Sequence, residues 1–305
     1  MIEQSNMTLL QNIKKNKKEY NSHAEEKKQT KNIDILNKAY NRAIGGGLAG
    51  SSAMIIQITS LMWLRTTMNY QYKYGGNFRE SLSKLYNDGG IKRFYRGYSA
   101  ALAIGPMSRF GDTAANAYIL SLFEKSSIPV SVQTLCGSSV AALWRAFLMP
   151  IDAVKTTLQV KGKSGLSVLK RKMINHNPLI LYYGTIASMS ATFVGHYPWF
   201  LTYNILNERI PKYDELHKKL LRSAFIGFNA AVISDCSSNF LRVIKTVKQT
   251  SKNNNRYSEI VKNIIKKNGV KELFGRGLKT RIITNGIQGI LFTVCWRFIE
   301  ESYTK

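Results

Sequence analysis

The chain has 305 residues, and its 44 Lys and Arg against 18 Asp and Glu give a formal charge of +26. A chain with this much positive charge is expected to bind nucleic acid, an anionic lipid surface or anionic small molecules. The sequence contains no Gly-rich phosphate loop, no metal-ligand spacing and no nucleophile elbow, and its three cysteines form no CxxC pair, which disfavours a soluble enzyme or a disulfide scaffold.

Residues 1–40 are polar and rich in Lys, Asn and Glu, so they are predicted to form a mobile extension. They do not resemble a mitochondrial presequence, because acidic residues are present and the first arginine is Arg42. The mean hydropathy of −0.18 suggests a soluble protein. That average hides long uncharged runs such as residues 44–64, and about 20 such residues can span a bilayer as a helix.

An internal repeat of 90 residues follows the extension. A basic residue followed by threonine recurs at three equivalent positions: Arg65-Thr66, Lys155-Thr156 and Lys245-Thr246. Glycines keep the same spacing upstream, at Gly47, Gly137 and Gly227, and further glycines open apolar segments at Gly97, Gly184 and Gly277. Two features in one register predict a repeat architecture with units at 41–126, 127–214 and 215–303.

Each unit contains two apolar segments joined by a basic loop. The six predicted helices cover residues 42–69, 98–123, 131–158, 184–206, 220–247 and 278–300. Several carry charges, including Arg109, Asp112, Arg145 and Asp235. Charges at membrane depth normally face a protein interior or a watery cavity, so a ring of helices around a central cavity is favoured. The long basic loops are expected to share one side of the membrane.

Two motifs carry a resemblance to a known family. Pro150-Ile-Asp152-Ala-Val-Lys155 lies late in the third predicted helix, and Asp88-Gly89 followed by Phe94-Tyr95-Arg96-Gly97 lies before the second. Over about 41–302 the chain resembles the mitochondrial carrier family. The resemblance implies an all-α, multi-pass protein of the mitochondrial inner membrane with six transmembrane helices, three pseudo-symmetric repeats and short matrix-side helices.

The same resemblance implies function. A carrier moves a small-molecule metabolite by alternating access, without enzymatic activity, metal or cofactor. A monomer suffices because one chain holds all three repeats, cardiolipin is a plausible lipid partner, and no nucleic acid is expected.

The resemblance also implies a gate at the matrix end of the cavity. Pro150 would kink its helix, and Gly47, Gly137 and Gly227 would allow close helix approach. Repeat 1 has Met62, and repeat 3 has Arg242, where the family has an acid. The expected ion pair is Asp152 with Lys245, braced by Gln159. The predicted matrix gate comprises Arg65, Asp152, Lys155, Gln159 and Lys245.

The substrate site is expected at mid-cavity. The predicted residues are Arg109, Asp112, Arg145, His196, Asp235, Thr284, Asn285 and Gln288. Structural alternatives stay open: an Arg109–Asp112 pair within one helix, an Arg145–Asp235 pair between helices, and a His196 that only satisfies a hydrogen bond. The charges of four of these residues balance, which favours a zwitterion resembling an amino acid, with a small carboxylate as the next choice: Arg109, Asp112, Arg145 and Asp235. The rival functions are a carrier-like protein without transport and a basic nucleic-acid-binding protein.

Overall fold

The computed structural model describes residues 54–123, 128–251 and 255–303, and in these ranges the chain is mostly helical and contains no strand. The expected all-α fold is confirmed for this part of the chain. The predicted extension over residues 1–40 and the predicted packing glycine Gly47 lie outside it.

The order of helices recurs along the chain. The first helix covers residues 54–74 and is followed by α2 (Phe78–Asn87), α3 (Gly90–Phe94) and α4 (Tyr98–Leu122). Next come α5 (Val130–Phe147), α6 (Met149–Lys161), α7 (Ser164–His176), the 3₁₀ helix η1 (Pro178–Tyr182) and α8 (Thr185–Arg209). The last are α9 (Leu216–Thr250), α10 (Tyr257–Asn268), α11 (Val270–Gly275) and α12 (Leu278–Tyr303). Each third therefore has long helices on either side of short ones.

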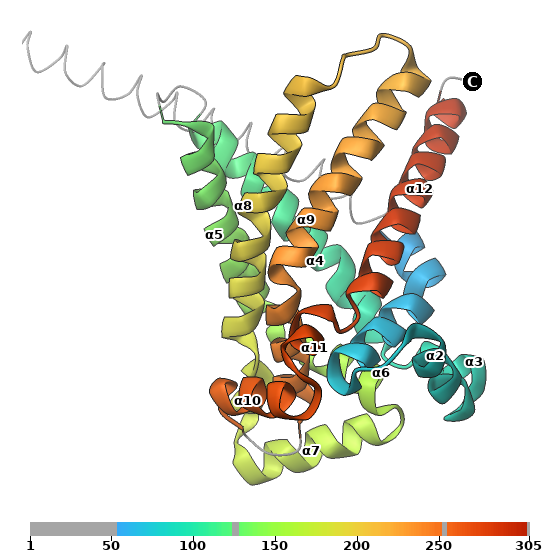
Figure 1. Cartoon of the computed structure of the whole chain (residues 1–305), viewed down its shortest axis with the longest axis vertical. Coiled ribbons are helices and arrows are strands. Elements are labelled where there is room, and N and C mark those ends of the chain that lie inside the picture. Colours follow the sequence, from blue (N-terminus) through green and yellow to red (C-terminus); the bar gives the residue numbers. More distant parts are fainter. Residues whose placement is uncertain (1–53, 124–127, 252–254, 304–305) are drawn as a thin grey trace, which may run out of the picture.

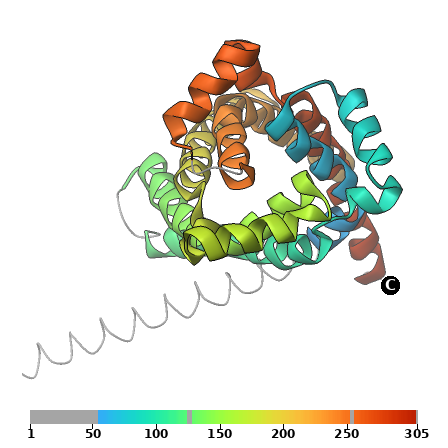
Figure 2. The same ribbon diagram turned by 90° about the horizontal axis from the view of Figure 1, so that it is seen from below.

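The long helices form a ring. The short helices α2, α7 and α10 all lie at its lower end in Figure 1, and the view from that end shows the ring (Figure 2). Packing follows chain order: α4 lies against α5, α5 against α8, α8 against α9, and α9 against α12. The ring closes between α12 and the first helix, where Thr280 Oγ1 donates to Gln71 Oε1 at 2.5 Å and Gln288 Nε2 donates to Gln57 Oε1 at 3.0 Å.

Proline and glycine determine where long helices break and begin. The segment predicted at 131–158 is broken into α5 and α6, and Pro150 lies in the first turn of α6, where its missing N–H costs no helical hydrogen bond. Repeat 3 has Phe240 at the equivalent position, and α9 continues through it for 35 residues. Gly97, Gly184 and Gly277 precede the even long helices with φ of 82°, 91° and 64°, a conformation that favours glycine.

Close contacts between helices occur at two glycines that the sequence did not single out. A Cβ on Gly111 of α4 would lie 2.0 Å from Trp144 Cδ1 of α5, and one on Gly105 would lie 2.2 Å from Ile58 Cδ1. Gly137 is buried, and its role in close helix approach stays a prediction. The prediction for Gly227 is wrong, because a Cβ there would meet no atom within 4 Å. The 90-residue register therefore does not identify which glycines allow close packing.

No helix in the described ranges combines the length and the apolar character of a membrane-spanning segment. The six membrane spans stay a prediction.

Candidate functional site

A cavity of about 320 Å³ lies inside the ring. All the long helices contribute to its lining, from the first helix through α4, α5, α6, α8, α9 and α12. Five predicted substrate residues line it: Asp112, Arg145, Thr284, Asn285 and Gln288. The five predicted gate residues also line it: Arg65, Asp152, Lys155, Gln159 and Lys245. The fold thus brings most of the predicted site into one space.

Asp152 is the centre of an ion-pair cluster in this cavity. Its Oδ1 lies 2.5 Å from Lys155 Nζ, its Oδ2 lies 2.6 Å from Lys245 Nζ, and the residue is only 6% exposed. A buried carboxylate is tolerated when it is paired and hydrogen-bonded in this way. The Asp152–Lys245 pair, expected from the sequence, is present and joins α6 to α9.

The glutamine that braces this cluster is not the predicted one. Gln249 Nε2 donates to Asp152 Oδ2 at 3.3 Å. Gln159 instead accepts a hydrogen bond from Asn69 Nδ2 at 2.6 Å and lies 3.5 Å from Met62 Sδ, so it links α6 to the first helix. Residues 69, 159 and 249 are equivalent by the 90-residue repeat, and the bracing role belongs to the third.

Arg145 and Asp235 do not pair with each other, contrary to one alternative from the sequence. Arg145 Nη2 lies 2.6 Å from Asp112 Oδ2, which joins α5 to α4. Asp235 is 3% exposed; Arg281 Nε lies 2.5 Å from its Oδ1, and Asn285 Nδ2 donates to its Oδ2. Each charge predicted on an odd helix is therefore neutralised by a neighbouring even helix.

Arg242 of α9 also lines the cavity. Among the described residues no carboxylate lies within ion-pair distance of it, and its Nε is buried without a hydrogen-bond partner. A buried donor without a partner carries a desolvation cost of about 1–3 kcal/mol, more when it is charged. Arg242 occupies the position equivalent to Asp152, which is the sequence signal that could have placed it in the site. Arg281, which the sequence also offers on the sixth predicted helix, lines the cavity too.

Cations outnumber carboxylates in the described cavity lining. Six cationic side chains line it: Arg65, Arg145, Lys155, Arg242, Lys245 and Arg281. Two carboxylates, Asp112 and Asp152, oppose them, and Asp235 behind Arg281 reduces the excess to three positive charges. The balance expected from four residues does not hold for the cavity, whose field favours an anion.

His196 is not part of the cavity lining. Its Nδ1 lies 2.7 Å from Ser138 Oγ, so the ring forms a hydrogen bond between α8 and α5. The prediction that it contacts substrate has no geometric support, and the structural alternative agrees with the contact. The side chain of Arg109 lies outside the described part, so its predicted role and its predicted pairing with Asp112 have no structural test.

Comparisons with known proteins agree on one family. The model described as "Mitochondrial carrier protein" matches residues 126–214 and 216–305. The chain is 23% identical over 269 residues to Mitochondrial substrate carrier family protein X of Dictyostelium discoideum, a match covering 84% of the chain and 89% of that relative. It is 27% identical over 172 residues to Mitochondrial citrate transporter D of Aspergillus niger, covering 51% of the chain and 55% of the relative.

A further relative is Calcium-dependent mitochondrial ATP-magnesium/phosphate carrier protein 2 of Arabidopsis thaliana, with 25% identity over 170 residues. This match covers 50% of the chain and 34% of the relative. The chain thus spans about half or less of the length of the citrate and ATP-magnesium/phosphate relatives.

Proposed function

The chain belongs to the mitochondrial carrier family, and from this premise we propose that it transports a small anionic metabolite across the mitochondrial inner membrane. The single observation that carries the choice of an anion is the excess of cations in the cavity lining. Transport by alternating access through six membrane-spanning helices is part of the same proposal.

Arg242 is the residue on which we base the anion site. Its position in the cavity lining and its unpartnered Nε make it a donor that a carboxylate or phosphate oxygen would satisfy. Arg281 and Arg145 each have a carboxylate partner, which Arg242 lacks among the described residues, although Arg145 Nε is also buried without a hydrogen-bond partner. A zwitterion would bring its own positive charge into this field, which argues against the amino-acid-like substrate favoured by the sequence.

The size of the cavity supports a small metabolite. Its volume of about 320 Å³ lies at the lower end of the range of about 300–1,000 Å³ that small-molecule sites occupy. The names of two relatives refer to citrate and to ATP-magnesium and phosphate, all anions in neutral solution. A multivalent carboxylate or a phosphate compound agrees with both observations.

Exposed apolar side chains on the long helices support a membrane location. Among the described side chains, large hydrophobic residues that are more than half exposed occur on four of these helices: Leu143 and Phe147 of α5, Ile186 and Tyr197 of α8, Leu221 and Phe225 of α9, and Ile290 of α12. Lipid chains around the ring would cover these side chains.

Uptake into liposomes tests the proposal. We expect purified protein to exchange or accumulate labelled phosphate, citrate or ATP and not neutral or zwitterionic amino acids. Arg242→Gln should lower anion uptake about 10- to 100-fold, because a hydrogen bond to a charged group contributes about 1.5–3 kcal/mol. The matched control is Arg79→Gln, which changes an exposed arginine of α2 outside the cavity.

Two results would contradict the proposal. Undiminished anion uptake by Arg242→Gln would remove Arg242 from the site. A folded wild-type protein that moves no anion in any combination of internal and external substrate would instead favour the carrier-like protein without transport.

A further inference from the structure

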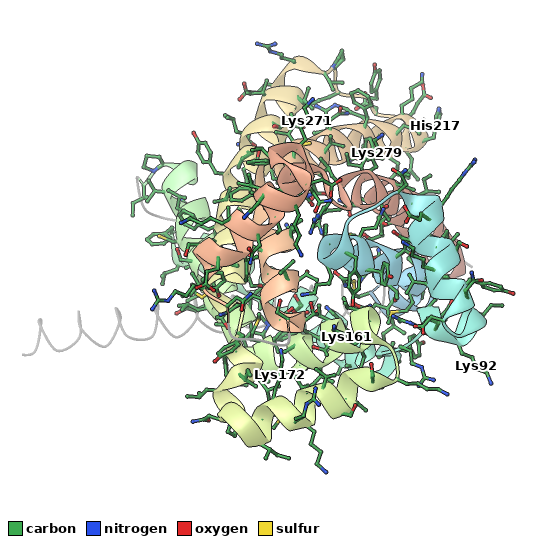
Figure 3. All side chains as sticks on the ribbon, turned by 60° about the horizontal axis from the view of Figure 1, so that its bottom comes forward. Lys92, Lys161, Lys172, His217, Lys271 and Lys279 are labelled. Carbon is green, nitrogen blue, oxygen red and sulfur yellow. The ribbon has the colours of Figure 1, made fainter. Side chains whose placement is uncertain are left out.

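The lower end of the ring holds three lysines just beyond the cavity. Lys73 follows the cavity residue Asn69 by four positions on the first helix, one turn further toward this end. Lys161 ends α6 and Lys172 lies on α7. Figure 3 shows Lys161 and Lys172 on the inner side of this end, whereas Lys92 lies at its outer edge. We call Lys73, Lys161 and Lys172 the lysine cluster.

Cationic side chains cap the carboxyl ends of three long helices, namely the first helix, α6 and α9. The counterions of these cations differ. At the end of α6, Arg93 donates to the carbonyls of Gln159 and Val160 at 2.9 and 3.0 Å, and Asp88 neutralises it at 2.5 Å. At the end of the first helix, Arg276 donates to the carbonyl of Lys73 at 3.5 Å and pairs with Glu272 at 3.0 Å. Both caps are thus close to neutral.

The carboxyl end of α9 lacks such a counterion. Lys73 Nζ donates to the Val247 carbonyl at 3.5 Å and to Ser251 Oγ at 2.8 Å. Lys172 Nζ donates to the Gln249 carbonyl at 3.3 Å. No carboxylate in the described ranges pairs with either lysine. Two ammonium groups therefore converge on one helix end, where the partial negative charge of the helix accounts for about half of one charge.

Unused donors accompany this uncompensated charge. An ammonium group has three N–H donors, of which Lys73 uses two and Lys172 one in the contacts above. Lys161 adds its charge nearby, with its Nζ 5.9 Å from the centre of the Tyr74 ring. Lys172 is only 8% exposed, so this charge is held in place by the fold and does not extend freely into water.

We propose that the lysine cluster is a second anion site, separate from the cavity, which binds the phosphate group of a soluble phosphate compound at the mouth of the ring. The ligand supplies the counterion that Asp88 and Glu272 supply at the other two helix ends. Binding here does not depend on the transport proposed above, although an anion that arrives at this end of the ring would meet the cluster before the cavity.

The ionisation of the cluster agrees with this geometry. Burial, with the charges of Lys161, Lys172 and Arg276, lowers the pKa of Lys73 to about 8. Burial, with the charges of Lys161 and Lys248, lowers the pKa of Lys172 to about 8. Glu272 and Asp88, the carboxylates that cap the neighbouring helix ends, are already paired with arginine. Phosphate binding is therefore expected to weaken as the pH rises through about 8, where the lysines lose their protons.

Competitive acetylation of the purified full chain tests the site residue by residue. The protein is treated with a trace of acetic anhydride near pH 8, and the modification of each lysine is measured by mass spectrometry. Inorganic phosphate at about ten times its Kd should slow modification of the lysine cluster about tenfold by mass action. Lys92 and Lys271, which are exposed at the same end (Figure 3), serve as controls and should react at unchanged rates.

Two further arms locate the phosphate. In Arg242→Gln the protection should persist, because the cluster is separate from the cavity; its loss would mean that phosphate binds only in the cavity and would overturn the proposal. Protein in vesicles of anionic phospholipid, without added phosphate, should keep reactive lysines. Protection by these vesicles alone would assign the cluster to lipid headgroups and overturn the soluble ligand. Unchanged reactivity of the cluster at saturating phosphate would leave the lysines as helix caps only.

Discussion

Replacing Asp152 by asparagine should destabilise the protein strongly. Asn keeps the size of the side chain but removes the charge shared by Lys155 Nζ at 2.5 Å and Lys245 Nζ at 2.6 Å. Removing one partner of a buried ion pair costs about 3–5 kcal/mol, because the other charge stays buried without a counterion. Since both lysine side chains are 21% exposed, we expect a cost near the lower end, about 3 kcal/mol.

Thermal unfolding of the detergent-purified protein measures this effect. For a chain of 305 residues an unfolding entropy of about 2.1 cal/mol/K per residue means that each kcal/mol lowers the melting temperature by about 1.5 °C, so Asp152→Asn should melt about 5 °C below wild type. Glu80→Gln is the matched control, since Glu80 and Lys84 are also 2.5 Å apart but their side chains are 53% and 59% exposed. Water and salt screen that pair, and the control should melt with the wild type.

A second substitution separates lost charge from lost packing. Lys245→Met in the Asp152→Asn background removes one ammonium left without its partner, so part of the lost stability should return. An Asp152→Asn protein that melts within a degree or so of wild type would refute the argument that this cluster contributes to stability, and so would an equal fall in Glu80→Gln.

Two further predictions concern packing and pH. Gly111→Ala should lower the melting temperature, because the new Cβ would lie 2.0 Å from Trp144 Cδ1, whereas Gly227→Ala, in open space, should melt as wild type does or slightly higher. The melting temperature of the wild type should rise with pH between about 8 and 10.5, because Lys73 and Lys172 are deprotonated in the folded state over this interval but still protonated when unfolded. Lys172→Met should flatten that rise; a flat wild-type profile would contradict the lowered pKa values.

The Asp152–Lys245 pair was predicted from the pairing order that the resemblance to mitochondrial carriers implies, and two features of the sequence agree with it. The Pro150 motif places an acid and a base one helical turn apart, and the 90-residue register places the third basic residue at the same depth on another helix. Depth and helix order are enough when the partners face a common axis. The glycines that open the second, fourth and sixth long helices were predicted differently, from the aromatic residues and glycine that end each basic stretch, and the structure confirms them.

The 90-residue spacing was not enough to predict the ion-pair partners of the other charged residues. Arg145 and Asp235 are equivalent by repeat and so share a depth, but depth does not determine which neighbouring helix each side chain faces. The partners are Asp112 of α4 and Arg281 of α12, one helix back and one helix forward in the ring. Gln159 and Gln249 differ in the same way, because only the second lies within reach of Asp152. A repeat spacing gives the depth of a residue along its helix but not the direction in which its side chain points around the helix axis.

Two positions where the sequence departs from the family motif, Met62 and Arg242, have the same effect in the structure. Met62 and Arg242 occupy the positions equivalent to Asp152, so two of the three carboxylates that would neutralise the cationic lining are missing. Asp152 already forms ion pairs with Lys155 and Lys245. Arg242 therefore has no carboxylate partner among the described residues. On the proposed function, a ligand with two negative charges replaces the two missing carboxylates. Ligand binding and closure of this end of the ring would then be one electrostatic event, because the substrate supplies the charge that the protein lacks.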